Sequence, residues 1–134
     1  MKRRDAAVFG GFLVLFWAGL SAVLLAKGGL FIAKHEGDTM HLIDIVLREA
    51  AGEWPHLDFM TPIGYLATAP IAWAVAQGWT LGMAFLVAQV AVAAVLLLPI
   101  WWVGASRLRT GWAMVFGAIC LMLALALVHG ESQP

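Results

Sequence analysis

Long stretches without charge constrain the fold of this chain more than any other feature. Residues 6–26 and 80–104 contain no Asp, Glu, Lys or Arg, and about 20 apolar residues are enough to cross a bilayer. Residues 63–77 and 111–129 are also free of these residue types. Hydrophobic residues make up 63% of the 134 residues and charged residues 12%, whereas soluble domains contain roughly 45–50% and 25%. The sequence therefore predicts an all-α, polytopic membrane protein, a single membrane domain with about four transmembrane helices at these positions.

The positive charges indicate how such a chain is oriented. Lys2, Arg3 and Arg4 precede the first apolar stretch, so the N-terminus is expected in the cytoplasm. A cleaved signal peptide also begins with basic residues, but its apolar core is shorter, at about 7–15 residues, and we expect a retained helix. If all four stretches cross, Arg107 and Arg109 lie outside, against the positive-inside tendency. If the second stretch only enters the membrane and turns back, both arginines lie in the cytoplasm. We expect four crossings.

The polar residues concentrate in the expected external loop, residues 27–62. This loop holds six of the eight acidic residues and three of the four histidines. Asp38 stands where an N-cap would stand, before a run in which Met40, Ile43, Leu47 and Ala50 recur on one face of a helix. Gly52 follows as a helix end. We therefore predict an amphipathic helix over residues 39–51, which is too short and too charged to span and lies at the membrane interface.

Carboxylates and imidazoles just outside a membrane can act on lipid-linked substrates whose reactive head lies at that depth. The Asp38 carboxylate could serve as a general base for an acceptor hydroxyl. It could instead hold a divalent metal, with His41 three residues further on as a second ligand. His35, His41 and His56 match no tight zinc-ligand spacing. The competing interpretation is structural: Asp38 caps a helix, and the other charges are solvated.

The order of residues in this region adds a second line of inference. Asp38-Thr-Met-His-Leu is followed by Gly52-Glu-Trp-Pro-His-Leu-Asp-Phe, then by Pro62-Ile-Gly-Tyr-Leu and Ala69-Pro70. This order resembles the N-terminal part of bacterial GT-C type membrane glycosyltransferases, over about residues 6–78. In that family an acidic motif follows the first membrane helix. An amphipathic helix, a Gly-x-x-Pro-aromatic-x-Asp-Phe segment and a Pro-led second helix come next.

The resemblance implies an enzyme that moves a sugar from a polyprenyl-phosphate donor to an acceptor on the outer face of the bacterial inner membrane. Asp38 would be the base or the metal-site residue, with Mg²⁺ or Mn²⁺ as the implied ion. His56 and Asp58 lie in the matching segment and are further candidates. The family often has a second acidic residue directly after the first. Here Thr39 occupies that position, and Glu36 is the candidate substitute.

Three functions stay open, because members of that family usually run to several hundred residues with many more helices. The chain could be a short or truncated glycosyltransferase that acts alone or with another chain. It could be a non-catalytic accessory subunit of a larger membrane protein complex. It could be a small lipid-carrier transporter, although the apolar stretches offer few polar residues at membrane depth beyond Gln89. Small-residue faces such as Ala113 and Gly117 favour helix contacts, within the monomer or with other membrane subunits. The formal net charge of zero gives no basic surface for nucleic acid.

Overall fold

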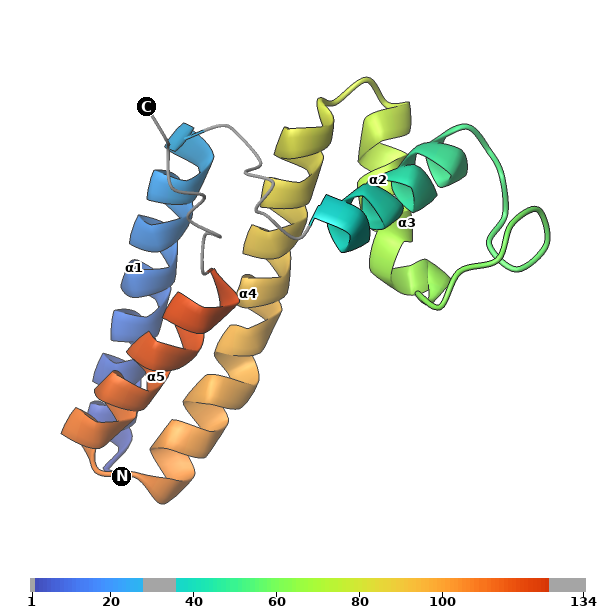
Figure 1. Cartoon of the computed structure of the whole chain (residues 1–134). Coiled ribbons are helices and arrows are strands. Elements are labelled where there is room, and N and C mark those ends of the chain that lie inside the picture. The colour runs from blue at the N-terminus through green and yellow to red at the C-terminus, as the bar shows by residue number, and fades with distance from the viewer. Residues whose placement is uncertain (1, 28–35, 126–134) are drawn as a thin grey trace. The chain divides into compact units, whose positions relative to one another are not determined.

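The structure, a computed structural model, describes residues 2–27 and 36–125 (Figure 1). These residues form five α-helices and no β-strand, so the all-α prediction is confirmed. The helices are α1 (Arg3–Lys27), α2 (Glu36–Ala50), α3 (Tyr65–Ala76), α4 (Leu81–Arg107) and α5 (Thr110–Ala124).

Two of the described helices, α1 and α4, are long and apolar enough to cross a membrane by length and composition. The 27 residues of α4 extend for about 40 Å, which exceeds the roughly 30 Å of a hydrocarbon core. The 12 residues of α3 extend for only about 18 Å. α5 is also shorter, with 15 residues, and residues 126–129 of the predicted fourth crossing lie outside the described residues. Membrane association is therefore supported, while four crossings stay a prediction.

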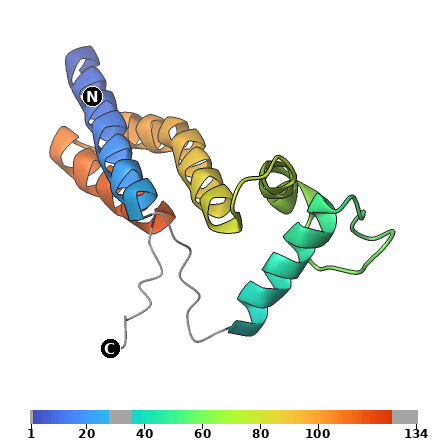
Figure 2. The ribbon, with the colours of Figure 1, turned by 90° about the horizontal axis from the view of Figure 1, so that it is seen from above.

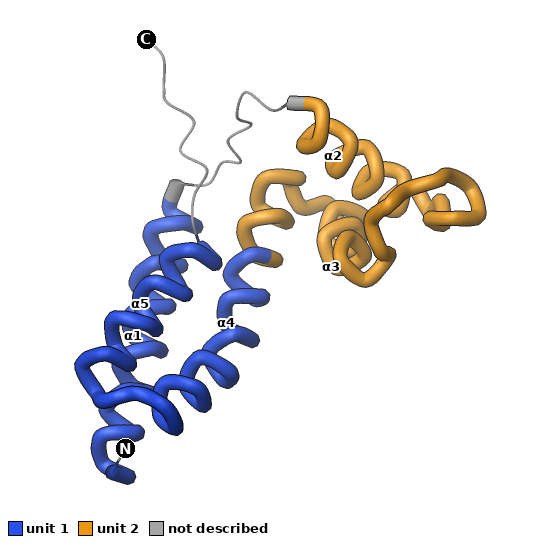
Figure 3. Tube along the Cα trace, turned by 60° about the horizontal axis from the view of Figure 1, so that its bottom comes forward, with its two compact units in different colours: residues 1–27, 89–127 blue, residues 28–88, 128–134 orange. Residues whose placement is uncertain are grey.

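The chain divides into two compact units, which are described separately (Figure 3). The described part of unit 1 is residues 2–27 and 89–125, which form α1, most of α4, and α5. The described part of unit 2 is residues 36–88, which form α2, α3 and the first two turns of α4.

The core of unit 1 is built around the ring of Phe9 in α1, which is 0% exposed. A methyl group added at Gly104 of α4 would lie 2.5 Å from Phe9 Cε1, and one added at Gly117 of α5 would lie 3.2 Å from Phe9 Cε2. The ring therefore lies between α4 and α5, where only residues without a side chain leave space for it. Ala113 and Leu13 are buried in the same cluster. The small residues of the last apolar stretch thus pack inside unit 1.

α1 and α4 run in opposite directions within unit 1 (Figures 1 and 2). Near the start of α1, Trp101 Nε1 donates a hydrogen bond to the Ala6 carbonyl oxygen at 3.0 Å. Further along α1, Trp17 Nε1 donates to the Val90 carbonyl oxygen at 3.2 Å. Residues later in α1 therefore contact residues earlier in α4, so the two helices are antiparallel. The start of α1, the end of α4 and the start of α5 consequently lie at one end of unit 1.

In unit 2, α2 packs against α3 through the face that carries Val46. Val46 lies in a buried cluster with Ile71, Ala72 and Ala74 of α3 and with Ala84 from the beginning of α4. Burial of such side chains is worth roughly 25 cal/mol per Å² of apolar surface removed from water. This cluster is what holds the polar residues of α2 in a defined place.

The start of α2 differs from the expectation, and the face that α2 packs on α3 is one that the sequence pattern did not indicate. The helix begins at Glu36, so Asp38 is its third residue and not its N-cap. A carboxylate in the first turn is still favoured there by the positive end of the helix dipole. The face packed on α3 also centres on Val46, whereas Met40 and Leu47 are 57% and 48% exposed. These two side chains remain available to an apolar surface outside the unit.

Glycines end α2 and α3 in the same way. Gly52 and Gly78 have φ angles of 94° and 90°, in the left-handed region that side chains disfavour. After α2, the Glu53 N–H donates to the Arg48 carbonyl oxygen, and the Gly52 N–H donates to that of Glu49, each at 3.0 Å. This pair of bonds is the Schellman motif, and it recurs after α3. The helix end predicted at Gly52 is confirmed.

Candidate functional site

The segment between α2 and α3 forms a tight turn held by its own polar groups. Asp58 Oδ2 accepts a hydrogen bond from the Trp54 N–H at 2.7 Å, and the His56 N–H donates to the Phe59 carbonyl oxygen at 2.7 Å. The Trp54 ring stacks on Tyr65 with centroids 5.4 Å apart. His56 has a φ of 67° and an exposed side chain. The Asp58 carboxylate therefore supports the turn that presents His56.

Arg48 joins the end of α2 to this turn. Its guanidinium lies 3.0 Å from Asp44 Oδ2 and 3.2 Å from Glu53 Oε2, and its Cζ lies 5.4 Å from the centroid of the Phe59 ring. The hydrogen bond that Arg48 donates to Asp44, then the charges of Asp44 and Glu53, raise the pKa of Arg48 above its ordinary value. Arg48 therefore stays cationic and forms ion pairs with Asp44 and Glu53. Asp44 and Arg48 are four residues apart on α2, a spacing at which opposite charges favour the helix.

A buried polar contact fixes α2 to α3. The Thr68 hydroxyl donates to Glu49 Oε1 at 2.7 Å, and Thr68 is 1% exposed. The second carboxylate oxygen, Glu49 Oε2, is buried and has no hydrogen-bond partner among the described residues. An acceptor left without a donor in such a place costs about 1–3 kcal/mol. The remaining bond to Thr68 is correspondingly important for the position of α2.

Asp38 differs from the other acidic residues described in this region. Asp44, Glu49, Glu53 and Asp58 each accept a hydrogen bond. The Asp38 carboxylate makes no hydrogen bond or ion pair with any other described residue, and it is exposed. The first turn of α2 therefore presents an exposed carboxylate that has no partner among the described residues.

Two of the sequence candidates have a defined place beside Asp38 in the chain. His41 is exposed on α2, three residues after Asp38, and residues at this spacing lie on neighbouring parts of a helix surface. Glu36 is the first residue of α2, but its side chain lies outside what the structure describes. His35 lies outside the described residues altogether.

The metal site predicted at Asp38 and His41 offers two protein ligands, one carboxylate and one imidazole. Over residues 2–27 and 36–125, no three His, Cys, Asp or Glu side chains form a group that could hold a metal ion. One carboxylate and one imidazole do not enclose an ion. Mg²⁺, however, is commonly bound by one or two carboxylates together with the phosphate oxygens of a substrate. Mg²⁺ or Mn²⁺ at Asp38 stays a prediction.

Comparison of the chain with protein-family models, with curated proteins and with solved structures finds no match. The function must therefore be argued from the residues of α2, the turn and α3 themselves.

Sequence reasoning missed the contact between Glu49 and Thr68. Thr68 is the one hydroxyl residue within α3 that is buried, and Glu49 lies one turn beyond Ile45 on the buried side of α2. A polar residue on each of two apolar faces is a signal for a polar contact between helices. The signal was overlooked because the spacing of Met40 and Leu47 indicated a different face of the helix, the one expected to lie on the membrane.

Proposed function

We propose that the chain is a GT-C-like membrane glycosyltransferase that uses a polyprenyl-phosphate-linked sugar as donor. In this proposal it resides in the bacterial inner membrane, with the N-terminus in the cytoplasm and residues 27–62 outside. The observation that carries the proposal is the availability of Asp38. It is the exposed acidic side chain that the described part of unit 2 leaves without an internal partner.

The proposed reaction transfers the sugar by substitution at its anomeric carbon. Asp38 accepts the proton of the acceptor hydroxyl as the hydroxyl oxygen forms its bond to that carbon. The bond between the anomeric carbon and the phosphate oxygen breaks at the same time. Polyprenyl phosphate leaves with the bonding electron pair. In the alternative role for Asp38, it would hold a divalent cation together with His41, and the cation would neutralise charge on the phosphate; the scheme above does not depend on it.

The contacts of unit 2 support a fixed position for this base. The buried cluster around Val46 and the bond from Thr68 to Glu49 fix α2 against α3. The ion pairs of Arg48 then connect α2 to the turn that carries His56 and Asp58. A base on a packed helix is held in one position, and a fixed position lets it meet the acceptor hydroxyl in the geometry that the reaction requires.

The test compares two aspartates of the same helix. Membranes containing the wild-type chain, Asp38→Asn or Asp44→Asn are incubated with polyprenyl-phosphate-linked sugars, and the release of polyprenyl phosphate is measured. Asp44 is the matched control, because it is also exposed on α2 but pairs with Arg48. Loss of a general base lowers the rate by about 10²–10⁴-fold, so we expect that loss for Asp38→Asn and little change for Asp44→Asn.

The same experiment separates catalysis from the other functions considered. Transfer that is unchanged in Asp38→Asn would remove Asp38 as the base. No release by the wild-type chain, together with retention of partner subunits by both variants, would favour the accessory subunit. The transporter is not favoured by the described contacts, because Gln89 Nε2 already donates to the Ala124 carbonyl oxygen at 3.1 Å.

A further inference from the structure

The end of unit 1 where α1 begins and α4 ends carries a concentration of positive charge. The cations there are Lys2, Arg3, Arg4, Arg107 and Arg109, all exposed. They are five of the eight Lys and Arg residues of the chain. Residues 28–80, which follow the other end of α1, contain six acidic residues and only two basic ones. Most of the positive charge of the chain therefore lies at this end of unit 1.

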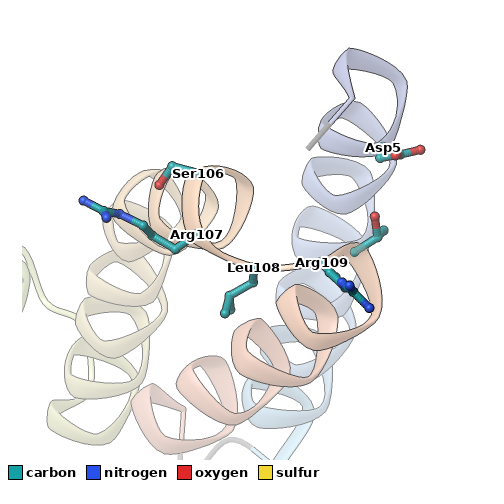
Figure 4. A pocket seen from close by; sticks show the side chains of 6 residues that line it. Asp5, Ser106, Arg107, Leu108 and Arg109 are labelled. Carbon is teal, nitrogen blue, oxygen red and sulfur yellow. The ribbon is translucent and has the colours of Figure 1, made fainter.

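A shallow depression marks the basic end (Figure 4). Asp5 of α1 lines it together with the end of α4, the turn that follows and the start of α5, which contribute Ser106, Arg107, Leu108, Arg109 and Thr110. In Figure 4 the side chains of Arg107 and Arg109 point to different sides of this turn. Arg107 and Arg109 also have no ion pair among the described residues. Both guanidinium groups are available to anions outside the protein.

Exposed indole rings lie near the same end. Trp102, five residues before the end of α4, is 68% exposed, and Trp112 in the first turn of α5 is 69% exposed. Nearer the middle of α4, before Trp102 in the chain, the exposed side chains are aliphatic, as at Val95 and Leu98, which are 71% and 74% exposed. Trp side chains are enriched where the apolar surface of a membrane protein meets the lipid headgroups, and this arrangement fits that pattern.

We propose that this basic end is a docking surface for anionic phospholipid headgroups of the cytoplasmic leaflet, and that α1 and α4 cross the membrane in opposite directions. The bonds from Trp101 to Ala6 and from Trp17 to Val90 establish the opposite directions. α3, which lies between α1 and α4 in the chain, then stays on the outer side without crossing. This orientation concerns the membrane alone and does not depend on sugar transfer.

The proposal resolves the conflict that arises from four crossings. If α3 crossed, α1 and α4 would run in the same direction through the membrane, and Arg107 and Arg109 would face outward. The contacts within unit 1 show the opposite direction. α3 is also too short, because its 12 residues cover about 18 Å of a hydrocarbon core of roughly 30 Å. All five cations then obey the positive-inside tendency.

Accessibility of two cysteines tests the orientation directly. Gln77→Cys and Ser106→Cys are placed singly in a Cys120→Ala background and treated with a membrane-impermeant maleimide in spheroplasts. Gln77 and Ser106 are both exposed in the protein, and neither change alters a charge. We expect Gln77→Cys to react in intact spheroplasts, and Ser106→Cys to react several-fold more after permeabilisation. Four crossings predict the reverse pattern. The reverse, or any pattern other than the expected one, overturns the proposal.

Retention of lipid tests the docking surface. The full chain is purified through mixed micelles of phosphatidylglycerol and phosphatidylcholine, and the retained lipids are quantified. Arg107→Gln removes one charge at the basic end, and Lys27→Gln, at the other end of α1, is the matched control. We expect the wild type to enrich phosphatidylglycerol, with a several-fold loss in Arg107→Gln alone. No enrichment, or equal losses in both variants, would contradict a headgroup site at this end.

Discussion

Replacement of Gly104 by Ala tests whether the Phe9 ring is as tightly enclosed as the structure indicates. The new methyl carbon would lie 2.5 Å from Phe9 Cε1, 2.7 Å from Phe9 Cζ and 3.4 Å from Ala113 Cβ. The ring is 0% exposed, and Gly117 of α5 also borders it, since a methyl group at Gly117 would lie 3.2 Å from Phe9 Cε2. Either the ring or a helix backbone must therefore move.

The expected cost follows from overpacking. Insertion of a methyl group into a filled core costs about 1–3 kcal/mol. Ala also favours a helix over Gly by roughly 0.5–1 kcal/mol, which partly offsets this cost. Gly11→Ala is the matched control, since a methyl group at Gly11 of α1 meets no atom within 4 Å. The difference in stability between the two variants should equal the overpacking cost, at about 1–3 kcal/mol.

Cys120 supplies the assay, because it is the single cysteine of the chain and packs against the core cluster of unit 1. A thiol-reactive fluorophore reports the unfolding of purified protein in detergent as temperature rises. We expect Gly104→Ala to unfold at a lower temperature than the wild type and Gly11→Ala at the same or a higher one. Phe9→Leu in the Gly104→Ala background should recover part of the loss, with a coupling of roughly 0.5–3 kcal/mol. Equal stability of the two alanine variants would refute the enclosure of the ring.

Three smaller changes test other contacts. Thr68→Val removes the donor to Glu49 and should lower the free energy of unfolding by about 1–3 kcal/mol, whereas Thr68→Ser should not; denaturant titration measures both, and equal losses would deny the hydrogen bond a role. Trp101→Phe removes the bond to the Ala6 carbonyl oxygen and should cost about 0.5–1.5 kcal/mol in the same assay, a prediction that wild-type stability would contradict. His56→Gly removes a side chain from a φ of 67° and should stabilise the turn by about 1 kcal/mol, and a loss of stability would mean that the imidazole makes an essential contact.

Sequence periodicity predicted the helices well because apolar length and glycine punctuation act locally. The stretch expected at residues 80–104 became α4, Leu81–Arg107, and the stretch expected at 63–77 became α3, Tyr65–Ala76. Gly52 ended α2 where its freedom to adopt positive φ indicated an end. The start of α2 was misplaced, because Asp38 suits both an N-cap and a first turn, and the two positions differ only in backbone geometry.

The packing of those helices was less predictable. The direction of α4 relative to α1 depends on pairs such as Trp17 with Val90, which are 73 residues apart, and no local pattern encodes them. Asp38 was chosen from residue type and order, and the structure places it exposed in the first turn of α2; its role stays a prediction. The structural use of Asp58 and Glu49 was not foreseen, because a carboxylate in a sequence looks the same whether it meets a substrate or a backbone N–H.

The hydrogen bond between Thr68 and Glu49 has a mechanical consequence. Because it ties α2 to α3 beside a shared apolar cluster, the two helices must tilt and sink together. In the proposed orientation α3 stays on the outer side without crossing, so the depth at which it rests in the outer headgroup region would set the height of the Asp38 carboxylate. That depth would favour lipid-borne sugars whose reactive carbon lies at the matching height.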